Sequence, residues 1–129
     1  MSFILVADDD PLLGDIVRFK LESAGHRVVV VENGQAALET VAAERPDILI
    51  LDSMMPVMSG QHVLQKLKSD AATASIPVVI LTARKGQEDV VAALQNGADD
   101  YMTKPFMPEE LLLRVRTVLA RFGAANAAA

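Results

Sequence analysis

The sequence predicts a single α/β domain, in which a five-stranded, doubly wound parallel sheet carries helices on both faces. The first observation behind this prediction is that five short apolar segments alternate with amphipathic ones, the pattern of a (βα)5 chain. The second is length, because 129 residues suffice for one domain with a core but not for two. The third is composition, since 51% of the residues are hydrophobic, which argues against disorder.

The apolar segments are predicted to be the strands of the sheet. The third of them is the most informative, because the four consecutive apolar residues before Asp52 indicate a strand that is buried on both faces. Turn-forming residues follow Asp52 and prevent the strand from continuing. The predicted strands are residues 3–7, 28–31, 47–52, 77–82 and 100–103.

The first two helices are predicted to begin at good capping residues. Asp10 is expected to cap the first helix, with Pro11 at its first position and Gly25 at its end. Asn33 is expected to cap the second helix rather than to form a hairpin turn with Gly34, because the residues that follow have helical spacing. The predicted inner face of the first helix consists of Leu13, Ile16, Val17, Leu21 and Ala24.

Three further helices follow. The third is predicted at residues 60–69, and the fourth is expected to start near Gly86 and to end at Gly97. Pro108 is expected to open the fifth helix and Gly123 to close it. The buried side of the fifth helix is predicted to consist of Leu111, Leu112, Val115, Val118, Leu119 and Phe122.

Composition excludes several classes of function. The net charge is −5, so we do not expect this domain to bind nucleic acid directly. The chain has no cysteine, which excludes disulfides and thiolate metal sites, and no segment has the pattern of a signal peptide or a membrane span. We therefore expect a cytoplasmic protein. Residues 1–122 are expected to form the domain, and residues 123–129 an unstructured tail, a linker stub or a cloning remnant.

Polar residues stand where four of the five predicted strands end. They are Asp8, Asp9 and Asp10 after the first strand, Asp52 at the end of the third, Thr82 at the end of the fourth and Lys104 after the fifth. Each has a simple structural explanation of its own, such as a helix cap or a solvated charge. Parallel strands, however, all end at the same edge of a sheet, where open α/β sheets bind their ligands. We therefore expect these side chains to share one crevice.

The residue types at this edge suit phosphoryl transfer. Neighbouring carboxylates repel each other unless a cation lies between them. Oxygen ligands without histidine or cysteine indicate a hard ion such as Mg²⁺, which also favours phosphate. A carboxylate can attack phosphorus to form an aspartyl phosphate, while a lysine and a hydroxyl bind the phosphoryl oxygens. The strand-end residues together form one complete set for that reaction.

These residues are also the ones by which the chain resembles the receiver domain of two-component response regulators. The matching motifs, spread over residues 3–122, are Asp8-Asp9, Asp52 with Met55-Pro56 and Gly60, Thr82-Ala83, and Lys104-Pro105-Phe106. The resemblance implies a flavodoxin-like sheet of order 2-1-3-4-5. It also implies phosphorelay signal transduction, in which a sensor histidine kinase or a phosphotransfer protein donates the phosphoryl group.

The resemblance assigns the acceptor and the metal ligands. Asp52 would be the phosphoryl acceptor and a ligand of Mg²⁺. Asp9 would bind the ion directly, Asp8 would help through water, and Met54 would supply its backbone carbonyl. By the same resemblance the domain is not an enzyme acting on other molecules. It would be a phosphoacceptor that catalyses its own phosphotransfer and its own dephosphorylation.

The resemblance also assigns a switch. Thr82 and Lys104 would contact the phosphoryl oxygens, and Thr82 would move toward the phosphate. Tyr101 matches the family's switch aromatic, which swings inward at the same time; the alternative is a strand aromatic that never moves. The Lys104-Pro105 peptide bond is expected to be cis, as in the family.

A dimer surface is the last expectation from the resemblance. Residues 97–121 resemble the winged-helix, OmpR-like branch, whose receivers dimerise through the fourth helix, fifth strand and fifth helix. The apolar candidates are Val90, Val91, Leu94 and Leu112, and the charged ones are Asp99, Asp100, Glu110, Arg114 and Arg121. Val90 departs from the branch, which usually has a basic residue there. The alternative is that the apolar residues are core and the charges a solvated rim.

Two other functions fit parts of the sequence. A haloacid-dehalogenase-like phosphatase would use Asp8 as the nucleophile of an Asp-x-Asp motif. That interpretation leaves Asp52 without a role, and the chain has no room for a cap domain. A pseudo-receiver would keep the fold as a binding module without phosphorylation, but the intact set of strand-end residues argues against it.

Overall fold

The computed structural model describes the backbone of residues 2–82 and 97–128, and the side chains of residues 2–82 and 97–121. Its five strands are all parallel, in the order β2-β1-β3-β4-β5, so the expected sheet order is confirmed. The strands are β1 (Phe3–Ala7), β2 (Arg27–Val31), β3 (Ile48–Asp52), β4 (Val78–Thr82) and β5 (Asp100–Thr103).

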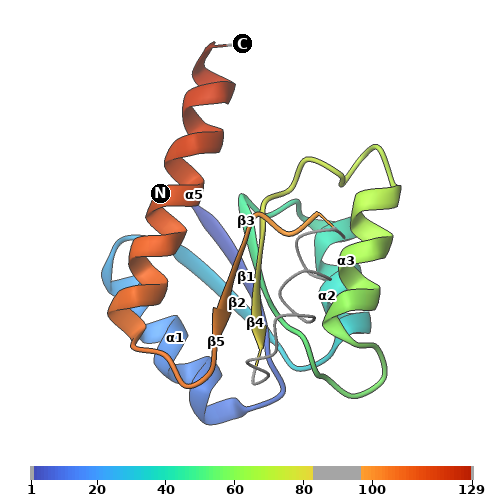
Figure 1. Cartoon of the computed structure of the whole chain (residues 1–129), viewed down its shortest axis with the longest axis vertical. Coiled ribbons are helices and arrows are strands. Elements are labelled where there is room, and N and C mark those ends of the chain that lie inside the picture. The colour runs from blue at the N-terminus through green and yellow to red at the C-terminus, as the bar shows by residue number, and fades with distance from the viewer. Residues whose placement is uncertain (1, 83–96, 129) are drawn as a thin grey trace.

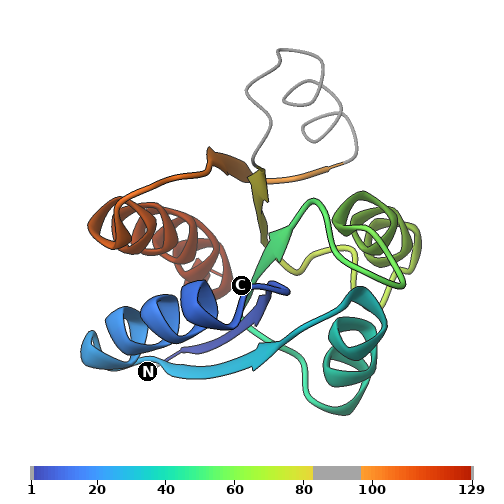
Figure 2. The same ribbon diagram turned by 90° about the horizontal axis from the view of Figure 1, so that it is seen from below.

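Helices cover both faces of this sheet, as Figures 1 and 2 show. They are α1 (Pro11–Ser23), α2 (Gly34–Ala43), α3 (Gly60–Ser69) and α5 (Pro108–Ala128). Helices α1 and α5 pack on one face and α2 and α3 on the other, so the core consists of two apolar clusters with the sheet between them. The predicted fourth helix, from about Gly86, falls on residues 83–96, which lie outside the described residues.

The caps predicted from the sequence are present. The Asp10 side chain accepts hydrogen bonds from the amides of Leu12 and Leu13 at the start of α1, and Asn33 accepts one from Ala36 at the start of α2. Gly25 follows the end of α1 with a φ of 94°, a conformation that favours glycine. These local signals fix where the helices begin and end, and therefore where the loops at the edge of the sheet lie.

The inner face predicted for α1 is wrong at one position. Ile16 is 42% exposed, and the buried residues of the helix are Gly14, Val17 and Leu21. Gly14 lies so close to β2 that an added Cβ would be 3.0 Å from Val30 Cγ1. Because the glycine brings this side of the helix against the sheet, Ile16 is turned outward.

The end predicted for α5 is also wrong. The helix continues through Gly123 to Ala128 instead of ending at the glycine, and α5 extends beyond the body of the domain in Figure 1. A glycine inside a helix costs about 1 kcal/mol relative to alanine. The four alanines among residues 124–128 are the strongest helix formers, which explains how the helix passes the glycine. None of the described helices is long and apolar enough to cross a membrane.

Leu112 belongs to the core, as predicted for the buried side of the fifth helix, and not to the dimer surface on which it was also a candidate. It is only 6% exposed and packs in the cluster between the sheet and α1 and α5. The next residue, Leu113, is 60% exposed and is the apolar residue that α5 presents to solvent.

Candidate functional site

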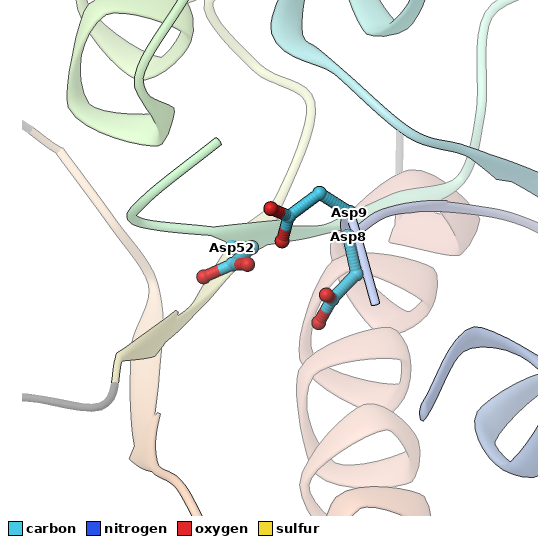
Figure 3. Close-up of side chains that lie close together, drawn as sticks. All are labelled: Asp8, Asp9 and Asp52. Carbon is cyan, nitrogen blue, oxygen red and sulfur yellow. The ribbon is translucent and has the colours of Figure 1, made fainter. Parts of the chain in front are cut away.

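Three carboxylates meet at the carboxyl edge of the sheet. Asp8 and Asp9 follow β1, and Asp52 ends β3; each offers an oxygen within 4.8 Å of the others (Figure 3). The two strands are neighbours, and their register pairs Ala7 with Leu51, so Asp8 lies beside Asp52. Asp8 is 1% and Asp52 4% exposed, whereas Asp9 is exposed to solvent. The sheet therefore places two buried acids beneath one accessible acid.

Lys104 joins this group from β5. Its Nζ lies 2.9 Å from Asp8 Oδ2 and 3.2 Å from Asp52 Oδ2, so one ammonium group bridges the two buried carboxylates. Burial alone would lower the pKa of Lys104. The hydrogen bond to Asp8 and the charge of Asp52 outweigh burial, and the pKa is raised. The peptide bond between Lys104 and Pro105 is cis, as predicted.

Asp52 is an unusually weak acid in this environment. Burial raises its pKa, and the negative charge of Asp8 raises it further. The hydrogen bond that Asp52 Oδ1 accepts from the Met54 amide and the nearby Lys104 ammonium act in the opposite direction, and the net result is a pKa of about 6. Asp52 is therefore largely ionised at neutral pH, with a free-energy cost that a nearby cation would reduce.

Thr82, Met54 and Tyr101 are the remaining predicted site residues, and they come from three different parts of the fold. Thr82 ends β4 and is buried next to the end of β3. Met54 follows Asp52 in the chain, and its side chain is exposed. Tyr101 lies on β5 and packs partly buried against the apolar cluster between the sheet and α2 and α3. Five predicted site residues thus lie at the ends of neighbouring strands, and Tyr101 lies within the fifth strand.

Comparison with known proteins identifies the family. The family model of the response regulator receiver domain matches residues 4–116. The chain belongs to this family. It is a receiver domain of a two-component response regulator, and domains of this family act in signalling and are generally not enzymes.

Several relatives of this receiver domain are named as transcriptional or DNA-binding regulators. The chain is 44% identical to the DNA-binding response regulator MtrA of Mycolicibacterium smegmatis, over 92% of this chain and 50% of the relative. It is 39% identical to the phosphate regulon transcriptional regulatory protein PhoB of Pseudomonas aeruginosa, over 93% and 52%. The chain therefore spans about half the length of these curated relatives. Among solved structures, a Francisella response regulator receiver domain matches with a TM-score of 0.89 and 34% identity, covering 95% of this chain and 99% of that one.

A pocket opens on one side of the carboxylates in this receiver domain. It is lined by Asp9 and by five residues of the loop after β3, namely Ser53, Met54, Met55, Pro56 and Ser59. Asp9 and Met54, two of the predicted metal ligands, therefore border the same space.

An apolar groove opens on the other side of the site, and sequence reasoning missed it. Its walls are Asp10, Leu12, Leu13, Ile16, Lys104, Pro105 and Phe106. The exposed side chains of Leu12, Ile16 and Phe19 form a stripe along α1. Their spacing of four and three residues was a signal in the sequence. It was overlooked because the neighbouring buried stripe has the same period.

The charges of the predicted dimer surface are partly paired within the chain. Arg114 Nη1 lies 3.0 and 3.1 Å from the two carboxylate oxygens of Asp100, and Arg114 Nε lies 3.9 Å from Glu110. Asp99 accepts a hydrogen bond from the Val78 amide. The expected apolar residues Val90, Val91 and Leu94 lie outside the described residues.

Proposed function

We propose that Asp52 accepts a phosphoryl group and that Lys104 and Thr82 bind the oxygens of that group. The observation that supports this most strongly is the position of Lys104 Nζ, 3.2 Å from Asp52 and 2.9 Å from Asp8. An ammonium group held beside the acceptor is placed to neutralise charge on a transferred phosphoryl group. Asp52 is also the acid of this group whose pKa is raised, and it ends β3 beside the loop that lines one of the two openings at this edge.

The carboxylates also fit a magnesium ion. Three carboxylate oxygens within 4.8 Å, without a nitrogen or sulfur ligand among them, suit a hard divalent cation. We propose that Asp9, Asp52 and the Met54 carbonyl hold it, with Asp8 acting through water. When bound, Mg²⁺ would supply positive charge to the phosphoryl oxygens.

The proposed reaction is a displacement at phosphorus. An oxygen of ionised Asp52 forms a bond to the phosphorus of a phosphohistidine on the donor. The phosphorus–nitrogen bond breaks, and the electron pair leaves with the imidazole nitrogen. Lys104 then pairs with the new phosphoryl group instead of with the free carboxylate. Thr82 then moves toward the phosphoryl group, and Tyr101 swings inward at the same time. Phosphorylation thereby changes the surface formed by β5 and α5.

The donor must approach at the mouth of the site, and the groove beside Lys104 gives it a surface. Leu12 and Ile16 are exposed apolar residues on the groove wall, next to the residue that would bind the phosphoryl group. A sensor histidine kinase or phosphotransfer protein that brings a phosphohistidine to Asp52 would cover them. We propose that this groove receives the donor protein.

The wider role follows from the relatives. Two of them are named as a DNA-binding or a transcriptional regulator, and this chain matches about half of each. We infer that this domain lies in the cytoplasm and that its phosphorylation controls transcription. The domain itself would not contact DNA, because its net charge is −5. We also propose that the domain forms a homodimer through β5, α5 and the region between β4 and β5.

The test is the intact mass of the protein after incubation with a small phosphodonor and Mg²⁺. The wild-type chain and Asp8→Asn should gain one phosphoryl group, the latter more slowly, and Asp52→Asn should gain none. A label that persists in Asp52→Asn and is lost in Asp8→Asn would support the phosphatase reading instead. A wild-type chain that gains no label would support the pseudo-receiver.

A further inference from the structure

The turn at Val57, in the loop between β3 and α3, has a strained backbone. Val57 has a φ of 71°, and the Met58 amide donates a hydrogen bond to the Pro56 carbonyl at 2.8 Å. A hydrogen bond that spans one residue of positive φ defines the rare and strained form of the γ-turn. Valine is poorly suited to this conformation, because its branched Cβ crowds the backbone.

The side chain of Val57 does not offset this strain. It is 83% exposed, so it gains little from packing, whereas the neighbouring Met55 and Met58 are partly buried against the core. Strained residues persist only when the surrounding structure holds them in place, and they cluster at functional sites. The contacts around this loop must therefore hold Val57 in its strained conformation.

Two glycines confine this loop, one at its end and one in the neighbouring helix α2. A Cβ added to Gly60, the first residue of α3, would lie 2.1 Å from the carbonyl oxygen of Asp52, and the Gly60 amide donates to Ser53 at 3.1 Å. A Cβ added to Gly34, the first residue of α2, would lie 2.6 Å from the Met58 carbonyl oxygen. The chain therefore leaves β3 and returns to nearly the same point with α2 against its side. Both contacts hold the loop in the closed form that contains the strained turn.

We propose that the strained turn at Val57 makes this loop open locally, and that this opening sets how long a phosphoryl group remains on Asp52. The strain is present only in the closed loop, so it lowers the free energy of opening. The open loop admits water next to Asp52. The water oxygen then bonds to phosphorus, the bond from phosphorus to the Asp52 oxygen breaks, and the carboxylate and inorganic phosphate are released, with one water proton passing to phosphate or solvent.

This inference rests on the proposed function, but its first test needs no phosphorylation. Hydrogen exchange of the Met58 and Gly60 amides would be measured in the wild-type chain and in Val57→Gly and Val57→Asn. Glycine and asparagine both tolerate positive φ, and only glycine adds backbone freedom. Both substitutions should slow exchange of the two amides on the order of tenfold, by relieving a strain of the usual size. Val57→Ala, which keeps a Cβ at positive φ, should have a smaller effect.

The second test is the half-life of the phosphorylated domain in the same variants. Val57→Gly and Val57→Asn should lengthen it in proportion to the slower amide exchange, and Met107→Ala, an exposed apolar change in the loop before α5, should not. Unchanged or faster exchange in both variants would overturn the proposal. So would slower exchange without a longer half-life, or an effect of glycine that asparagine does not share. Failure of the wild-type chain to become phosphorylated would refute the proposed function, while the exchange measurement would still decide the role of Val57.

Discussion

Asp52 combines burial, a neighbouring negative charge and a neighbouring ammonium in one side chain. Its pKa of about 6 is above the ordinary value of 3.8, chiefly because of burial. The folded state therefore binds a proton more tightly than the unfolded state, so stability falls as pH rises from about 4 to about 6 and stays low above that. The proposed phosphoryl acceptor is thus also a residue that destabilises the fold when it is ionised.

Asp52→Asn should for this reason stabilise the domain at neutral pH. A shift of this size corresponds to about 1–3 kcal/mol of unfolding free energy at pH 7–8, and the advantage should disappear toward pH 4, where Asp52 itself is neutral. Urea denaturation of both chains across this range, in the presence of a chelator, measures the difference. Two curves that stay parallel from pH 4 to pH 8 would contradict the raised pKa.

Asp9 is the accessible member of the carboxylate group, so it should decide whether a metal ion binds. Mg²⁺ at one hundred times its dissociation constant should stabilise the wild-type chain by about 2.7 kcal/mol, seen as a higher Tm. Asp9→Ala should remove this rise. Asp15→Ala removes an exposed acid of α1 outside the carboxylate group and should leave it intact. A Tm that still rises with Mg²⁺ in Asp9→Ala would exclude Asp9 as a ligand.

Helix α1 has two apolar stripes with different tasks. Gly14, Val17 and Leu21 face the sheet, while Leu12, Ile16 and Phe19 face solvent. Leu12 and Ile16 also line the groove beside Lys104. Ile16→Glu should therefore slow phosphotransfer from a donor protein by tenfold or more, on the order of one lost apolar contact. It should leave phosphorylation by a small phosphodonor unchanged. Leu113→Glu, on α5, is the matched control for an exposed apolar residue. Equal slowing with both donors would show damage to the site rather than to docking.

Helix α5 gives a separate test at the scale of one element. Because Gly123 lies inside the helix, Gly123→Ala should increase helicity and stabilise the C-terminal turns by about 0.5–1 kcal/mol. Circular dichroism and thermal unfolding measure both effects. If the helix ended at Gly123 with a positive φ, alanine would instead lower the stability.

At the scale of the whole molecule, phosphorylation is expected to change the state of association. In the proposed switch, Tyr101 would connect the site to the surface of β5 and α5, where Leu113 is exposed among Asp100, Glu110, Arg114 and Thr117. The Asp100–Arg114 pair would have to rearrange, at least in part, to form bonds across a two-fold axis. Sedimentation should show a dimer with beryllofluoride and a monomer without it. A monomer in both conditions at tens of micromolar, roughly where a modest interface forms, would rule the dimer out.

The sequence predicted the features that depend on topology and local chemistry. Asp8, Asp52 and Thr82 were placed together because parallel strands end at one edge, and the caps at Asp10 and Asn33 follow from side-chain hydrogen bonding. The sequence failed where packing decides. Ile16 faces solvent because Gly14 lets α1 approach β2, and Leu113, rather than the correctly predicted core residue Leu112, is the exposed leucine because of how α5 lies on the sheet. The positive φ of Val57 could not be read from a valine, because it results from contacts made by Gly34 and Gly60.

The central claim is that Asp52 carries the phosphoryl group, and peptide mass spectrometry tests it most directly. The wild-type chain would be incubated with a small phosphodonor and Mg²⁺, digested at low temperature, and its phosphorylated peptide fragmented. The phosphoryl group should lie on Asp52, within the peptide that contains β3 and the loop after it. A phosphoryl group on Asp8 or Asp9, with Asp52 unmodified, would contradict the account.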